Sequence, residues 1–94
     1  MAVFGIMSFN LKTDLVLKCD VSSCDKYRNV KVVFVNCRKE KSEEYITSCV
    51  VGDGCITLPS VLSFPNFKKS YESAEYMKIK LLRGTICEEQ TIKL

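Results

Sequence analysis

The sequence predicts an all-β domain: one antiparallel, jelly-roll-like β-sandwich of about seven or eight short strands that spans residues 1–94. Three observations indicate this fold class. Apolar and polar residues alternate along several short runs. Turn sequences such as Gly52-Asp53-Gly54 and Arg83-Gly84-Thr85 separate these runs. No run has the spacing of a convincing amphipathic helix.

The first strand is expected at residues 4–8, where Phe4 and Ile6 alternate with smaller or more flexible residues. A half-buried antiparallel strand follows over 13–21, because its apolar residues share one face. These residues are Leu15, Leu17, Cys19 and Val21. The polar segment 22–29 is predicted to be a loop.

The strand expected at residues 30–37 is apolar on both faces. Val32 and Phe34 point one way, and Val33 and Val35 point the other way. A strand of this kind is covered on both sides in a folded protein. One small sandwich has a single interior, so we expect the second face to meet another subunit unless a loop folds over it.

The second half of the chain predicts two hairpins joined by an irregular connection. Pro59 ends the first hairpin, since proline has no N–H for the ladder. Residues 61–67 are expected to form a turn of helix or an irregular crossover that packs Val61, Leu62 and Phe64 inward. The other expected segments are a strand at 45–51, a turn at 52–54, a strand at 55–58, a polar loop at 68–75, and strands at 76–82 and 86–94.

The charge pattern argues against nucleic-acid binding. The formal net charge is +3, and the basic residues are dispersed instead of clustered. The charged loop at 38–44 carries three residues of each sign and is neutral overall. No apolar run approaches the roughly 20 residues of a membrane helix, and residues 1–7 lack the basic start of a signal peptide. We therefore expect a nuclear or cytoplasmic protein that does not bind membranes.

The residue types also argue against catalysis. The chain has no histidine, which removes the commonest general base and any Ser-His or Cys-His pair. Asp53 between two glycines is typical of a turn. The Gly52-Asp53-Gly54 sequence lacks the lysine and the further glycines of a phosphate-binding loop. We expect no catalytic residue and no cofactor.

Six cysteines raise the question of disulfides or a metal site: Cys19, Cys24, Cys37, Cys49, Cys55 and Cys87. Most of them lie in strand-like runs, where cysteine behaves as a small apolar residue, so reduced thiols and no bound metal are expected. Cys49 and Cys55 flank a turn, which leaves a disulfide or a thiol pair open. A secreted chain with disulfides is the alternative.

The order of the motifs resembles the core domain of the nucleoplasmin family, including the FKBP-associated nucleoplasmin-like domains. The correspondence begins with Phe4-Gly5-Ile6 and continues with the strands at 30–37 and 44–50. It includes Ile56-Thr57-Leu58-Pro59-Ser60-Val61-Leu62 and ends with Leu82-Arg83-Gly84-Thr85. The resemblance implies an eight-stranded jelly roll in a homo-oligomeric, pentameric ring, with histone chaperoning as the usual activity.

The sequence departs from that family where histone binding is concerned. Its longest acidic runs are the pairs Glu43-Glu44 and Glu88-Glu89, and its net charge is positive. The remaining acidic candidates for partner binding are Glu40, Glu43 and Glu44, which Arg38, Lys39 and Lys41 neutralise in sequence. We therefore expect weak histone binding or none.

Two non-enzymatic functions follow. The first is a homo-oligomeric scaffold or protein-binding domain. The resemblance implies that histones are among its partners. Its candidate interface residues are Val30, Val32, Val33, Phe34, Val35, Leu58 and Leu62. The alternative is a monomeric or dimeric immunoglobulin-like interaction module, such as an adaptor or a secreted effector.

Overall fold

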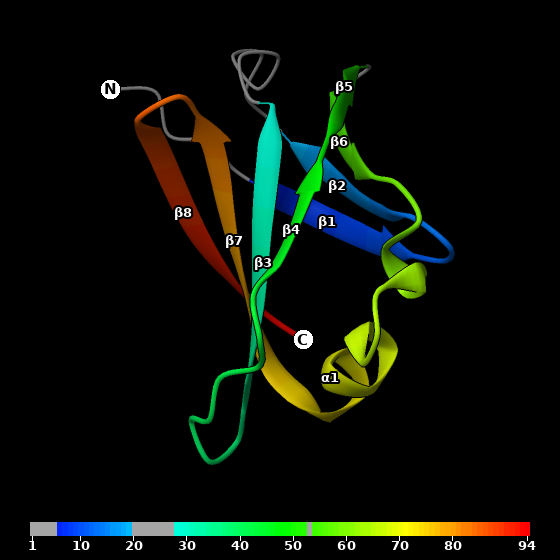
Figure 1. The fold of residues 1–94 in the computed structure, drawn as a ribbon, viewed down its shortest axis with the longest axis vertical. Helices are drawn as coiled ribbons and strands as arrows, with labels where there is room; N and C mark the ends of the chain where they lie inside the picture. Colours follow the sequence, from blue (N-terminus) through cyan, green and yellow to red (C-terminus); the bar gives the residue numbers. More distant parts are fainter. Residues whose placement is uncertain (1–5, 20–27, 53) are drawn as a thin grey trace.

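A computed structural model describes residues 6–19, 28–52 and 54–94 of the chain (Figure 1). The described residues form eight strands: β1 (Ile6–Leu11), β2 (Leu15–Cys19), β3 (Asn29–Asn36), β4 (Tyr45–Ser48), β5 (Val50–Gly52), β6 (Cys55–Leu58), β7 (Ala74–Arg83) and β8 (Ile86–Lys93). Two short helical segments lie between β6 and β7, the 3₁₀ turn η2 (Val61–Ser63) and the helix α1 (Phe67–Ser73). The expected strand opening at Phe4-Gly5, most of the loop at 22–29, Cys24 and Asp53 lie outside the described residues.

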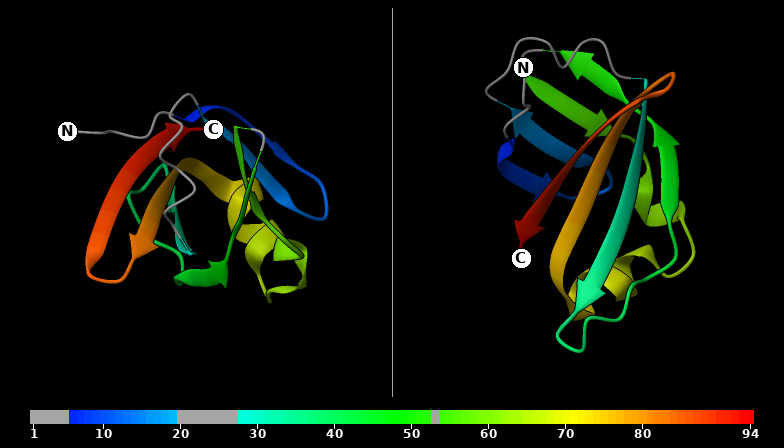
Figure 2. Two further views of the ribbon diagram at one scale, coloured as in Figure 1. Left: turned by 90° about the horizontal axis from the view of Figure 1, so that it is seen from above. Right: turned by 90° about the vertical axis from the view of Figure 1, so that its left-hand side faces the viewer.

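The strands form two antiparallel four-stranded sheets that pack face to face (Figure 2). The expected all-β antiparallel sandwich is therefore confirmed. One sheet has the order β1-β2-β6-β5 and the other β4-β3-β7-β8. If the eight strands are lettered A, B, C, C′, D, E, F and G along the chain, the two sheets have the orders A-B-E-D and C′-C-F-G. This is the strand order of an immunoglobulin-like sandwich. In a jelly roll the first and last strands pair, whereas here β1 and β8 belong to different sheets.

The chain passes from one sheet to the other between β4 and β5. The single strand expected at 45–51 is therefore two strands, since β4 pairs with β3 and β5 pairs with β6. Cys49 lies at the crossing, where its backbone N–H donates a hydrogen bond to the carbonyl oxygen of Arg28 at 3.1 Å. Alternation alone does not reveal such a crossing, because both halves keep the period of an extended chain.

A short helix replaces most of the loop expected at residues 68–75. Phe67 and Tyr71 are one helical turn apart in α1, so both face the sandwich, and Phe67 is 1% exposed. The lysines between them are exposed. A helix of seven residues is too short to be stable by itself in water, so burial of Phe67 is what stabilises it.

The connection at η2 matches one of its two expected forms, a turn of helix. Val61 is buried and Phe64 is half-buried, as expected. Leu62, which was expected to pack inward, is 37% exposed. Residues i and i+3 of a 3₁₀ turn share a face, so Val61 and Phe64 point inward together and Leu62 points outward.

The core lies between the sheets and consists mainly of the inward residues of four strands, together with Tyr45, Val61 and Phe67. Their side chains alternate with outward-facing ones along each strand, as the period of two requires. On these strands the inward residues are Leu15, Leu17, Cys19, Val30, Val32, Phe34, Ile56, Leu58, Met77, Ile79 and Leu81. β7 contains no cysteine, so no disulfide joins β2 to β7 through the core.

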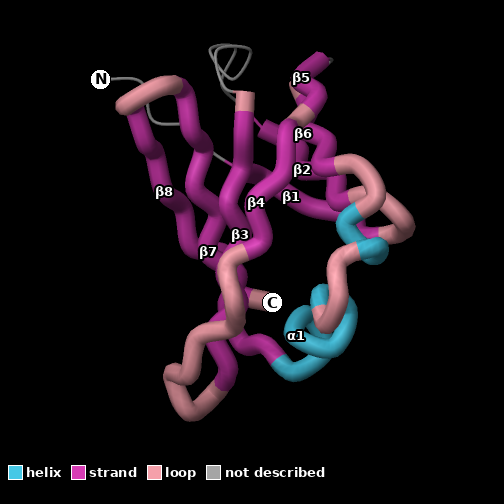
Figure 3. Tube along the Cα trace, viewed as in Figure 1, coloured by secondary structure: helices cyan, strands magenta, loops and turns pink. Residues whose placement is uncertain are grey.

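Figure 3 shows α1 at one end of the sandwich. Aromatic side chains pack together at this end. The ring centroids of Phe34 and Phe67 are 5.1 Å apart, and those of Tyr45 and Phe67 are 5.0 Å apart. Both pairs meet edge to face, an arrangement that adds about 0.5–1.5 kcal/mol per pair beyond area burial. Phe64 and Tyr71 extend the cluster with centroid distances of 5.9 Å to Tyr45 and 6.0 Å to Phe34. These contacts attach α1 to both strands of the β3–β4 hairpin.

We predict that Phe67→Ala lowers the free energy of unfolding by about 3–5 kcal/mol, because it removes a fully buried ring and leaves a cavity. Phe67→Leu should cost less, about 1.5 kcal/mol, since most of the volume remains. Urea denaturation measures both changes. Leu62→Ala is the control, and its exposed side chain should cost less than about 1 kcal/mol. Equal losses at the two positions would contradict the packing described for α1.

Candidate functional site

The structure divides the seven candidate interface residues into two groups. Val30, Val32, Phe34 and Leu58 are at most 2% exposed and pack inside the sandwich, so they are not available to a second chain. Val33 and Val35 point out of the β4-β3-β7-β8 sheet, and Leu62 lies on η2. Only these three positions lie outside the core.

We call the outer face of the β4-β3-β7-β8 sheet the lysine face. Strand register places its residues in rows across the sheet. One row contains Lys31, Lys80 and Glu89, the next contains Val33, Lys78 and Thr91, and the third contains Val35, Tyr76 and Lys93. Ile46 of β4 extends the first row beside Lys31.

Val33 and Val35 form the floor of the lysine face. Each is only 8% exposed, although neither belongs to the core between the sheets. Lys78 and Tyr76 stand directly opposite them on β7, and Lys41 bridges to Val35 on the other side. Long side chains lie along apolar surface in this way while their charged ends stay in water. The second face of β3 is therefore covered within the chain.

Positive charge predominates on this face. Lys31 forms an ion pair with Glu44 at 3.4 Å, and Lys80 forms one with Glu89 at 3.8 Å. Neither of these ion pairs involves Lys78, which lies at the centre of the face. Lys31 and Lys80 also stand directly opposite each other, a like-charge pair that the two carboxylates offset.

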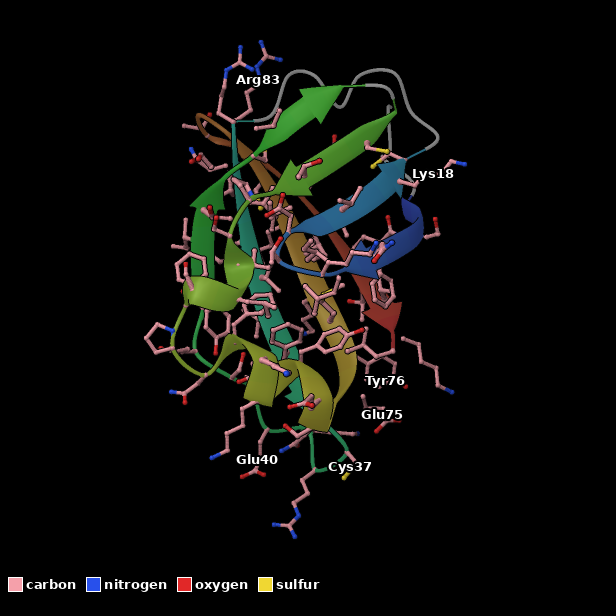
Figure 4. All side chains as sticks on the ribbon, turned by 90° about the vertical axis from the view of Figure 1, so that its right-hand side faces the viewer. Lys18, Cys37, Glu40, Glu75, Tyr76 and Arg83 are labelled. Carbon is pink, nitrogen blue, oxygen red and sulfur yellow. The ribbon has the colours of Figure 1, made fainter. Side chains whose placement is uncertain are left out.

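Two large apolar side chains are exposed on the lysine face. Ile46 is 54% exposed, and Tyr76 is 36% exposed. They lie diagonally across Val33, and Figure 4 shows Tyr76 near the end of β8, with Arg83 at the far end of the sheet. Neither these two residues nor Lys78 were among the interface residues expected from the sequence. The alternation of Tyr76, Lys78 and Lys80 along β7 is the signal that could have identified this face.

The three acidic candidates do not form one acidic surface. Glu40 belongs to a tight turn, where its side chain accepts a hydrogen bond from the Asn36 amide at 3.0 Å and its N–H donates to Asn36 Oδ1 at 3.0 Å. Glu44 pairs with Lys31 at the border of the lysine face. Glu43 lines a hollow beside α1. Figure 4 shows Glu40 and Cys37 at the tip of the molecule beyond α1.

Two hollows of about 150 and 390 Å³ separate the charged loop from α1. They share Ser42, Ser70 and Ser73. All three hydroxyls are engaged inside the chain: Ser42 Oγ accepts from the N–H of Phe34 at 2.9 Å, Ser73 Oγ donates to the Lys69 carbonyl at 3.1 Å, and Ser70 Oγ lies 3.2 Å from Tyr45 Oη. The hydroxyls here fix the loop and α1 in place.

Among the described residues, the structure gives reduced thiols at Cys19, Cys37, Cys49, Cys55 and Cys87. The register of β5 and β6 places Cys55 opposite Gly52, whereas Cys49 precedes Val50, which is opposite Thr57. Cys49 and Cys55 are therefore not cross-strand neighbours, contrary to the pairing left open above. Burial raises the pKa of the Cys49 thiol and outweighs the opposing effect of the Arg28 charge, so this thiol is neutral at physiological pH. Within the part of the chain that the structure describes, no group of acidic residues and cysteines is arranged to hold a metal ion.

We predict that Tyr45 titrates above the usual pKa of 10.0. Burial raises its pKa, and Glu43 adds to the effect against a lowering by the Ser70 hydrogen bond. The folded state then holds this proton more tightly than the unfolded state, so the stability that it contributes is complete below about pH 10 and is lost as the pH rises further. Ultraviolet absorbance of tyrosinate follows the titration.

In that titration, Tyr45→Phe should remove the transition that lies above the usual tyrosine range. Persistence of that transition in the Tyr45 variant would contradict the assignment.

None of the helices among the described residues has the length and apolar character needed to span a membrane. Comparison of the chain with protein-family models, curated proteins and solved structures finds no match.

Proposed function

We propose that this chain is a non-enzymatic protein-interaction module of immunoglobulin-like topology that binds a partner through the lysine face. The observation that carries the proposal is the exposure of Tyr76 and Ile46 on a regular sheet whose floor is apolar and whose border is charged. Tyrosine is enriched among the residues that dominate binding energy, and charged borders provide specificity and fast association.

The charge of the lysine face indicates the kind of partner. A face with five lysines and two glutamates attracts a protein surface that combines carboxylates with an apolar patch. The five lysines are Lys31, Lys41, Lys78, Lys80 and Lys93, and the two glutamates are Glu44 and Glu89. Two copies of this face would instead oppose lysine to lysine over much of the contact. A different protein with an acidic surface is therefore the better partner.

The homo-oligomeric scaffold implied by the nucleoplasmin resemblance is the second candidate. The outward direction of Val33 and Val35 is the observation in its favour. Their cover by Lys78, Tyr76 and Lys41 reduces the need for a neighbouring chain. The dispersed positions of Glu40, Glu43 and Glu44 do not support histone binding, for which dense negative potential is required.

A selection from a random displayed peptide library tests the main proposal. We expect the enriched peptides to combine Asp or Glu with aliphatic or aromatic residues. Lys78→Glu should weaken the binding of a synthetic enriched peptide about tenfold or more, because attraction at the centre of the face becomes repulsion. Lys78→Gln, which removes the charge and keeps a similar stem, should weaken it less.

Lys18→Glu is the matched control, since Lys18 is exposed on β2, in the other sheet (Figure 4). It should change affinity by less than about twofold. Enrichment of basic peptides, or an equal loss at Lys18, would contradict the proposal. Core histones at about 0.15 M salt should be retained no better than an unrelated basic protein, and selective retention would favour the chaperone candidate.

A further inference from the structure

The positive charge of the lysine face is balanced at one end only. Lys31 and Lys80, in the first row, each form an ion pair with a glutamate, at 3.4 and 3.8 Å. In the part of the chain that the structure describes, the other three lysines of the face form no ion pair. They are Lys41, Lys78 and Lys93. The unbalanced charge therefore lies in the second and third rows, beside Tyr76.

These three lysines surround Tyr76. Lys93 stands directly opposite it on β8, and Lys78 follows two residues later on the same face of β7. Lys41 stands opposite Val35, which is itself opposite Tyr76 on β3. Neighbouring strands are about 4.8 Å apart, and two residues of a strand span about 6.8 Å. All three lysines therefore start within about 10 Å of Tyr76, and their flexible four-carbon side chains can converge on one group bound over its ring.

Two acidic residues adjoin this cluster without neutralising it. Glu75 precedes Tyr76, and Figure 4 shows both at the same end of the sheet. Glu40 precedes Lys41, but its carboxylate accepts a hydrogen bond from the Asn36 amide at 3.0 Å. Over the described ranges neither glutamate forms an ion pair. The three ammonium groups and the exposed hydroxyl of Tyr76 are therefore available to a ligand.

The number of these donors favours a phosphate over a carboxylate. A carboxylate offers two oxygens and one negative charge. A phosphate monoester offers three acceptor oxygens and a charge of about −1.5 to −2 at neutral pH. Lysine is a common phosphate ligand, in which the ammonium group acts as a point charge. Three lysines around one tyrosine hydroxyl therefore match a phosphate group, with at least one donor for each of its oxygens.

We propose that the lysine face binds best to a phosphorylated partner protein, whose phosphate lies over Tyr76 among these three lysines. This inference rests on the proposed function, since it specifies the acidic group of the same partner. Val33 and the exposed Ile46 lie on the same face, so the site suits a phosphate that is flanked by apolar side chains. A phosphorylated peptide segment has such side chains, whereas a nucleic-acid backbone does not.

Three synthetic peptides test the inference. They share one sequence enriched in the displayed-library selection and differ at one acidic position, which is phosphoserine, aspartate or serine; each acidic position is tried in turn. At the best position, the phosphoserine peptide should bind about tenfold more tightly than the aspartate peptide at about 0.15 M salt, measured by isothermal titration calorimetry. Equal affinities at every position would overturn the phosphate inference and leave the proposed function standing.

Substitution of Lys93 tests the cluster. Lys93→Gln should reduce the preference for phosphoserine over aspartate to about threefold or less, because one charged donor is lost. Lys93→Arg keeps the charge and should retain the preference. Lys18→Gln, on the other sheet, is the matched control and should leave the preference unchanged. Equal reductions in the Lys18 and Lys93 variants would show that net charge alone attracts the phosphate, and would overturn the site.

Phosphoserine blocked at both ends is a probe that does not depend on the selection. In nuclear magnetic resonance spectra of nitrogen-15-labelled protein, its addition should shift the amide signals of residues 35, 41, 76–78 and 93 most. Blocked aspartate at the same concentration should shift them less. These shifts together with a selection that enriches no acidic peptide would refute the proposed function and support the phosphate site. Shifts spread over basic residues of both sheets would refute the site.

A single-stranded DNA of ten nucleotides and vesicles of anionic lipid distinguish the other sources of phosphate. Both should bind more weakly than the phosphoserine peptide. Tighter binding of either one, lost in Lys93→Gln, would overturn the assignment to a phosphorylated protein.

Discussion

Both layers of the molecule depend on the pairing of β3 with β7 at the centre of one sheet. β3 is apolar on both faces, and each face packs against a different part of the molecule. Its inward residues, Val30, Val32 and Phe34, fill the space between the sheets. Its outward residues, Val33 and Val35, form the floor under the lysines of β7. A shift of register by one residue would exchange these two sets and remove both the core and the apolar floor of the lysine face.

The same ladder positions the helical end of the molecule. Phe34 is the inward residue of β3 nearest α1, and its ring meets those of Phe67, Tyr45 and Tyr71. These contacts stabilise a helix too short to persist alone. In turn α1 contacts β4 through Ser70, whose Oγ lies 3.2 Å from Tyr45 Oη. Because Glu40 and Glu44 are held by Asn36 and Lys31, the charged loop does not present a single acidic surface.

Much of the fold follows from local sequence, and the remainder requires tertiary information. Period-two alternation and turn residues predict the sandwich and most strands, including the strand at 55–58, which matches β6. The helix at Phe67 depends on burial against β3, and the crossing at Cys49 changes sheets without changing the extended backbone. The order of the strands could not be predicted from the sequence, because hairpin signals do not specify which sheet each strand joins. The outward direction of Val33 was predictable, but its cover by Lys78 was not, since the partner strand is distant in sequence.

The most direct test of the central claim is to locate a bound peptide by nuclear magnetic resonance. An acidic peptide enriched in the selection is added to nitrogen-15-labelled protein, and the change in each amide signal is followed to saturation. The account predicts that the largest changes fall on residues 31–35 of β3 and 76–80 of β7, while β2 and β6 are unaffected. Changes centred on β2 and β6, or on the hollows beside α1, would contradict it.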